Sequence, residues 1–181
     1  LWQQAERLGG QEKLEKQLEA SEGYLVVLPE ASPLTVIKAR KRLQELWFTG
    51  RCRLQNLFSG LVLGVRESQT HPGADVIQWD TPEHVKDSWW QIEKVGDHVR
   101  FKNENSGLYL GVKRLQIGGQ LCQQPSQDKS TYWSVEILGE TFKLKNVVTG
   151  LYVDAPWKEK GWLPVLAVAQ NSQSQQWRLI P

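Results

Sequence analysis

The residues of this chain that are most capable of catalysis are its histidines and cysteines, and neither group has the spacing of an active site. His71, His84 and His98 fall in expected loops, without a His-x-x-x-His pair that could share one face of a helix. Cys52 and Cys122 lack a Cys-x-x-Cys neighbour, so we interpret them as buried free thiols rather than metal ligands. A Gly-x-Ser-x-Gly elbow and a glycine-rich phosphate loop are also absent from the sequence. The sequence therefore predicts a non-enzymatic protein with no metal or cofactor.

An internal repeat occupies residues 51–181 and must position whatever site the protein has. Three blocks, which begin at Cys52, Val99 and Phe142, align without gaps and share an Asn-x-x-Ser/Thr-Gly segment. The aligned positions are Asn56, Asn103 and Asn146; Gly60, Gly107 and Gly150; and, later in each copy, Trp90, Trp133 and Trp177. Such a period indicates a fold built from similar supersecondary units. We place the repeats at residues 51–95, 96–138 and 139–181.

Each repeat has the pattern of four short β-strands. Apolar and polar residues alternate on both sides of the Asn-x-x-Ser/Thr-Gly segment, as in a hairpin with one buried face. The glycine of that segment provides the positive φ that a tight turn needs. A third strand follows, and the repeated tryptophan begins the fourth. Three such units predict a mainly β protein with the threefold pseudosymmetry of a β-trefoil, whereas a propeller typically needs at least about four blades. The three tryptophans are expected to form a core layer.

The repeats resemble those of the ricin B-type β-trefoil lectins, a family of carbohydrate-binding modules. Repeats of that family carry a Ser-Gly-x-Tyr-Leu-Asp/Gly-Val strand and end in a Gln-x-Trp motif. The third copy is the most similar, with Thr149–Asp154 at its start and Gln175-Gln176-Trp177 at its end. The resemblance covers about residues 51–181. It implies a lectin-like module that targets or senses the terminal sugars of glycans, as part of a larger protein or an oligomer.

The resemblance also implies where sugars would bind. A family site combines a carboxylate after the second strand, an aromatic platform at the end of the third strand, and a polar amide shortly before the last tryptophan. In the third copy Asp154 and Gln175 occupy the carboxylate and amide positions, while Val168 stands at the aromatic position. We expect Trp157 or Trp162, on the adjoining polar loop, to replace the missing aromatic ring.

The other two copies depart further from the family pattern. In the first copy Trp79 holds the aromatic position, with Gln78 and Asp87 near it. Glycine replaces the carboxylate in the first and second copies, at Gly64 and Gly111. We therefore expect at most one or two working sites, with the third copy as the first candidate.

Residues 1–50 do not belong to the repeat and are expected to form a small helical segment. The apolar spacing predicts helices over residues 11–20 and 33–47, with a short strand over residues 24–28. A segment this short cannot bury an independent core. We therefore expect it to pack on the trefoil, to self-associate, to bind a protein partner, or to be the tail of an upstream domain. The chain starts with Leu and contains no Met, which favours a processed product or a piece of a longer protein.

Two other functions stay open on the sequence alone. The two glycines at carboxylate positions would permit a degenerate trefoil that acts as a protein–protein interaction scaffold without sugar binding. An actin-binding or membrane-surface trefoil would need a basic or apolar patch that the sequence does not clearly show.

Charge and hydropathy exclude further partners. The chain has 22 Lys and Arg against 20 Asp and Glu, a formal net charge of +2, so nucleic acid is not an expected partner. No apolar stretch approaches the roughly 18 residues of a transmembrane helix.

The positions of the two cysteines indicate the cellular compartment in which the protein is expected. Cys52 and Cys122 lie in different repeats at non-equivalent positions, so the disulfides within repeats that are common in secreted family members are missing. This favours a reducing, cytoplasmic location over a secreted one.

Overall fold

The computed structural model describes residues 50–180, which form twelve β-strands, four in each repeat. The strands of the first repeat are β1 (Gly50–Asn56), β2 (Val62–Val65), β3 (Val76–Trp79) and β4 (Trp90–Val95). Those of the second are β5 (His98–Asn103), β6 (Tyr109–Val112), β7 (Leu121–Gln124) and β8 (Trp133–Leu138). Those of the third are β9 (Thr141–Asn146), β10 (Tyr152–Asp154), β11 (Val165–Ala167) and β12 (Trp177–Ile180).

Helical structure in the described residues is limited to short 3-10 turns. They are η2 (Arg66–Ser68), η3 (Lys86–Ser88), η4 (Lys129–Thr131) and η5 (Gln173–Gln175). The last three occupy equivalent places immediately before the fourth strand of each repeat. The helices and the strand expected within residues 1–47 lie outside the described residues.

The first and fourth strands of the three repeats close into a barrel. Strand β1 pairs with β4, β4 with β5, β5 with β8, β8 with β9, β9 with β12, and β12 again with β1. All of these pairs are antiparallel. Closure gives each of these strands a neighbour on both sides, so the ring has no free edge.

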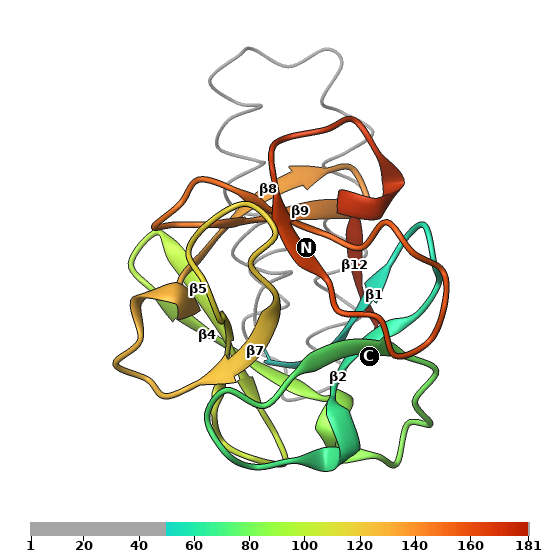
Figure 1. Ribbon diagram of the computed structural model, residues 1–181, viewed down its shortest axis with the longest axis vertical. Helices are drawn as coiled ribbons and strands as arrows, with labels where there is room; N and C mark the ends of the chain where they lie inside the picture. Colours follow the sequence, from blue (N-terminus) through green and yellow to red (C-terminus); the bar gives the residue numbers. More distant parts are fainter. Residues whose placement is uncertain (1–49, 181) are drawn as a thin grey trace, which may run out of the picture. The chain divides into compact units, whose positions relative to one another are not determined.

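The second and third strands of each repeat form hairpins beside this ring. The pairs are β2 with β3, β6 with β7, and β10 with β11. Figure 1 shows the repeats, coloured teal to green, yellow and orange to red, as three groups around a common centre. A closed ring of six strands with three hairpins under threefold pseudosymmetry is the β-trefoil that the sequence predicts.

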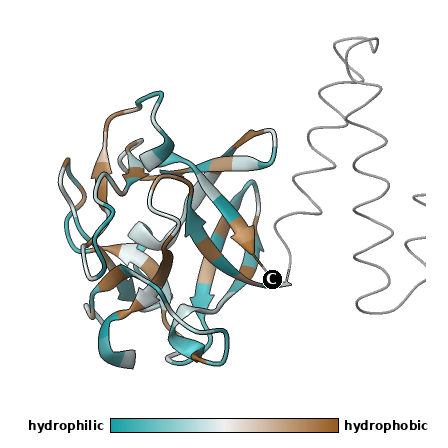
Figure 2. Cartoon of the chain, turned by 90° about the vertical axis from the view of Figure 1, so that its right-hand side faces the viewer, coloured by the Kyte–Doolittle hydropathy of each residue, from teal (hydrophilic) through white to brown (hydrophobic). Residues whose placement is uncertain are grey.

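The core is organised around the repeated tryptophans. Trp90, Trp133 and Trp177 are fully buried, which confirms the predicted core layer. Each indole N–H donates to a second-strand carbonyl of its own repeat: Leu63 at 3.1 Å, Leu110 at 3.0 Å and Val153 at 3.3 Å. Figure 2 shows hydrophobic and hydrophilic segments following one another along the same strands, the alternation of half-buried sheets.

The repeated asparagines join neighbouring repeats. The side-chain oxygen of Asn146 accepts from the backbone N–H of Val148 and Thr149 and fixes the hairpin turn, in which Gly150 has a φ of +71°. Its amide donates to the carbonyl of Ser130 in the preceding repeat, at 2.8 Å. Equivalent amide bonds run from Asn56 to Ser174 and from Asn103 to Asp87. The turn asparagine of each repeat therefore donates a hydrogen bond to the residue three positions before the repeated tryptophan of the preceding repeat.

Both cysteines are free and buried, as the sequence predicts. Burial raises the pKa of the Cys52 thiol and that of the Cys122 thiol to about 12 each. We expect both thiols to resist iodoacetamide in the native protein even at a pH of about 9, where a free thiol is largely ionised. Mass spectrometry of native and urea-unfolded samples checks this. Rapid native labelling of either cysteine would contradict the burial described for it.

Candidate functional site

The strand register defines which residues are equivalent in the three repeats. Val62 pairs with Trp79, Tyr109 with Gln124 and Tyr152 with Ala167. We call Trp79, Gln124 and Ala167 the platform positions, because they end the third strand. The residue equivalent to Trp79 is therefore Ala167 and not Val168, which corrects the sequence alignment by one residue. Neither residue is aromatic, so the third repeat still lacks a platform ring of its own.

Two further sets of equivalent residues face each other beside these platforms. We call Gly64, Gly111 and Asp154 the second-strand positions, and Asp87, Ser130 and Ser174 the turn positions. An ideal Cβ on Gly64 would lie 3.4 Å from Asp87 Oδ1, and one on Gly111 would lie 2.7 Å from Ser130 Oγ. The second-strand and turn positions are thus in contact in the first two repeats. The first and third repeats each hold one carboxylate in this pair of positions, and the second holds none.

The third repeat brings Asp154 and Gln175 together. Asp154 lies at the end of β10 and is 5% exposed. Its Oδ2 accepts a hydrogen bond of 3.2 Å from Gln175 Nε2, while Oδ1 has no partner among the described residues. A buried acceptor without a donor costs free energy, so such an atom needs an explanation, of which water or a ligand hydroxyl is one.

Gln175, which the sequence analysis places in the amide position of the sugar site, lies inside the fold. Its side chain is fully buried, and Nε2 also donates to the carbonyl of Val168 at 2.8 Å. Its Oε1 accepts from the backbone N–H of Gln170, also at 2.8 Å. Because all of these bonds are internal, Gln175 positions Asp154 and has no surface to offer a ligand.

Trp157 and Trp162 are exposed on the loop between β10 and β11. Their rings stack, with centroids 5.0 Å apart and planes inclined by 20°, and they are 36% and 48% exposed. Exposed aromatic faces on a loop fit contact with a ligand better than they fit core packing. This placement agrees with the expectation that they lie at the surface.

Gln78 is not a surface residue, contrary to its selection as a sugar-binding candidate. It is fully buried: Ser59 Oγ donates to its Oε1, and its Nε2 donates to the carbonyl of Trp157 at 3.1 Å. Its backbone also bonds with Trp162 and Gly161. Gln78 therefore fixes the tryptophan loop of the third repeat to strand β3 of the first.

The second repeat shows that this is a recurrent structural role. Gln123 accepts from Ser106 Oγ at 2.6 Å, and its amide donates to the carbonyl of Gln69 at 2.7 Å in the loop of the first repeat. The paired recurrence of Ser59 with Gln78 and of Ser106 with Gln123 was visible in the aligned sequence. The sequence did not reveal that each pair anchors a loop of another repeat, because those loops are distant in the chain.

The loop anchor brings a third tryptophan beside the stacked pair. Trp79 is 45% exposed, and its ring lies 3.4 Å from where a Cβ of Gly161 would stand. Gly161 immediately precedes Trp162. The exposed tryptophans of the first and third repeats thus gather along one junction between these repeats.

The sequence analysis noted one further acidic residue, Asp87, near the first-copy site but did not select it as a binding residue. Asp87 at the turn position of the first repeat is 9% exposed, and its Oδ1 also lacks a partner among the described residues. Burial raises the pKa of its carboxyl group, while the hydrogen bond from Ser68 acts in the opposite direction. The aligned sequence does show an aspartate at a position where the other two repeats have serine. Its importance was missed because the second-strand position of the first repeat is a glycine, which suggested that this repeat has no carboxylate.

Residues 50–180 contain no cluster of three or more His, Cys, Asp or Glu side chains that could hold a metal ion. In the same residues no helix is long and apolar enough to span a bilayer.

Comparison with known families shows what the first two repeats resemble. Residues 42–124 match the family model described as ricin-type beta-trefoil lectin domain-like. The resemblance to the ricin B-type lectins is confirmed. The match ends at Gln124, the last residue of β7, so the third repeat with its Gln-x-Trp motif lies outside it. No curated protein matches the chain.

Solved structures resemble the trefoil over its full extent. The designed threefold symmetric protein ThreeFoil is 24% identical with a TM-score of 0.69, over 73% of this chain and 99% of that one. An exo-beta-1,3-galactanase from Clostridium thermocellum is 26% identical with a TM-score of 0.68, over 73% of this chain and 30% of that one. A ricin B-like lectin from Macrolepiota procera, in complex with lactose, is 17% identical with a TM-score of 0.63, over 72% of this chain and 95% of that one. These likenesses support the β-trefoil fold.

Proposed function

We propose that the trefoil is a carbohydrate-binding module rather than a catalyst, and that its third repeat binds a terminal sugar through Asp154. The observation that carries this proposal is the pairing of Asp154 with Gln175. The amide holds one carboxylate oxygen and leaves the other, the buried Oδ1, without a partner among residues 50–180. An acceptor held in place before the ligand arrives is the arrangement that binding of a hydroxyl requires.

The chemistry follows from the groups present. A hydroxyl of a pyranose ring donates to Asp154 Oδ1, a charge-assisted hydrogen bond of the stronger kind. Gln175 keeps the carboxylate oriented and prevents it from rotating away when the site is empty. An outward face of the stacked Trp157–Trp162 pair covers the apolar side of a sugar ring, as aromatic rings do at such sites.

One site of this kind binds weakly, because a sugar offers few apolar contacts and its hydroxyls must give up water. Useful avidity therefore requires several sites or several copies, which raise the effective concentration without new contacts. We propose that residues 1–47 provide this, either by self-association or by joining the module to a protein partner.

A glycan array tests the proposal. The intact chain is displayed multivalently on beads and exposed to immobilised terminal sugars, among them lactose, the sugar named for the Macrolepiota procera lectin. We expect binding to a defined subset of glycans that the free sugar displaces. Uniform silence at high glycan density would contradict sugar binding and would favour the protein-interaction scaffold instead.

A further inference from the structure

We propose that the exposed aromatic residues at the junction of the first and third repeats form a surface that docks on a phosphatidylcholine bilayer. We call Phe58, Trp79, Trp157 and Trp162 the aromatic patch. This surface serves a function beyond the one proposed above, because its partner is a lipid and Asp154 takes no part in it. The sequence did not clearly show the apolar patch that a membrane-surface trefoil needs, whereas the fold assembles one.

Contacts between the two repeats make the aromatic patch continuous. The rings of Trp157 and Trp162 stack, and the Trp79 ring lies against the residue before Trp162, 3.4 Å from where a Cβ would stand. The ring of Phe58 has its centroid 4.5 Å from the Nζ of Lys158, which follows Trp157. The four aromatic residues are between 36% and 48% exposed. Together they present about 300–400 Å² of aromatic surface, as much as the largest apolar patch of a typical monomer, which is often functional.

The other repeats show that the fold itself does not require these aromatic side chains. The residues equivalent to Trp79 and Phe58 are Gln124, Ala167, Asn105 and Val148. The loops that correspond to the tryptophan loop of the third repeat, residues 66–75 and 113–120, contain no Trp, Tyr or Phe. Because the same hairpins and loops form without aromatic rings at these places, a role in folding does not explain the aromatic patch.

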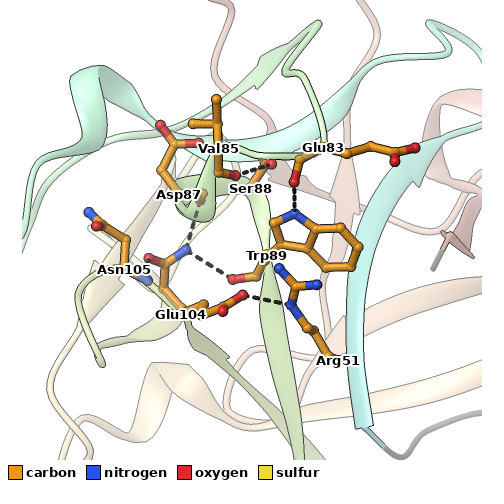
Figure 3. A network of polar contacts seen from close by, with 9 residues as sticks. Arg51, Glu83, Val85, Asp87, Ser88, Trp89, Glu104 and Asn105 are labelled. Carbon is orange, nitrogen blue, oxygen red and sulfur yellow. Dashed lines mark hydrogen bonds and ion pairs between the residues drawn. The ribbon is translucent and has the colours of Figure 1, made fainter.

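The seven tryptophans within residues 50–180 form two groups that differ in how the indole N–H is used. The four buried ones each donate to a backbone carbonyl. Trp89 is an example: its indole donates at 2.7 Å, and the Arg51 guanidinium covers its ring at 3.6 Å from the centroid (Figure 3). The indoles of Trp79, Trp157 and Trp162 donate to no group among the described residues. Each of the three therefore combines an exposed apolar ring with an unused donor, which is the combination that favours tryptophan at a membrane–water interface.

The charges beside the aromatic patch suit a zwitterionic lipid. Lys158 and Lys160 on the tryptophan loop are balanced by Glu159 and by Asp80, whose carboxylate pairs with Lys160 at 3.1 Å. Lys158 has no acidic partner among the described residues, and its ammonium group lies over the ring of Phe58. The phosphate of phosphatidylcholine can accept from this ammonium group and from the indoles. The choline is a quaternary ammonium group, which aromatic faces attract.

The test is flotation of the full chain with sugar-free phosphatidylcholine vesicles. We expect binding that rises with lipid concentration and persists in about 0.5 M salt, because burial of aromatic rings rather than net charge drives it. Phosphatidylcholine with bromine atoms on its acyl chains should quench part of the tryptophan fluorescence, since the exposed indoles would lie near the acyl boundary.

Trp79→Ala and Phe58→Ala are the decisive variants, because neither residue belongs to the sugar site proposed above. Each should weaken vesicle binding about five- to tenfold, with glycan binding on the array unchanged. Both side chains are exposed, so both variants should unfold within a few degrees of the parent. Ile117→Ala is the matched control: it removes a 65% exposed apolar side chain from the corresponding loop of the second repeat and should leave vesicle binding unchanged.

The outcomes separate the bilayer surface from the proposed function. Vesicle binding at full strength in both variants would place the lipid contact elsewhere in the chain and overturn the assignment. Binding only to phosphatidylglycerol vesicles, and only at low salt, would overturn it in favour of general electrostatic attraction. Self-association that Trp79→Ala abolishes, without any vesicle binding, would assign the aromatic patch to a second copy of the chain. Vesicle binding together with a silent glycan array would support the bilayer surface and contradict only the sugar site.

Discussion

Replacing Asp154 by asparagine is expected to weaken glycan binding by the third repeat about 10- to 100-fold while the fold stays intact. Asparagine keeps the size of the side chain and an oxygen that can accept from Gln175. It removes the charge, and the net contribution of a hydrogen bond to a charged group is about 1.5–3 kcal/mol. Array binding titrated against free sugar measures the loss, and circular dichroism with thermal unfolding monitors the fold.

Glu140→Gln is the matched control for this prediction. It removes the same charge from an exposed turn of the same repeat and should leave binding unchanged. If both variants lost binding equally, the general charge of the repeat rather than a specific acceptor would be responsible. Full retention of binding by Asp154→Asn would place the site elsewhere.

The largest expected effect on stability is that of Trp133→Ala. The side chain is fully buried, and its indole satisfies the carbonyl of Leu110 at 3.0 Å. Truncating a buried tryptophan costs about 3–5 kcal/mol, a large part of the roughly 5–15 kcal/mol that stabilises a domain. We expect the midpoint of thermal unfolding to fall by about 10–20 °C, or the variant to fail to fold.

Two companion variants divide this loss into its parts. Trp133→Phe keeps most of the apolar volume but leaves the carbonyl of Leu110 without a donor, so a smaller loss of about 1–3 kcal/mol is expected. Trp162→Ala removes an indole of the same size from the surface and should change stability little. Equal losses for Trp133→Ala and Trp162→Ala would contradict the core that the structure describes.

The candidate binding site was only partly predictable from the sequence. Asp154 and Gln175 were correctly placed together, because the repeat aligns them with a family motif. The platform was assigned one residue too late, at Val168 instead of Ala167, because only the pairing of Tyr152 with Ala167 sets the register of so short a strand. Gln78 was selected as a binding residue because the sequence does not reveal its buried contacts with Trp157, Gly161 and Trp162, which are about eighty residues away in the chain.

What the sequence determined by itself is the architecture of the repeats. The spacing of Asn146, Gly150 and Trp177 and their counterparts encodes a turn, a hairpin and a core position, all of which depend on neighbours in the chain or on burial. The tertiary structure decided what the polar side chains do, since their partners come from other strands and loops of the same repeat or from another repeat. Gln78 shows this most clearly: its sequence neighbours mark it as a strand residue, and only the packing of the tryptophan loop against β3 makes it a buried anchor. A hydrogen bond depends on distances of a few tenths of an ångström, which periodicity does not specify but a closed barrel does.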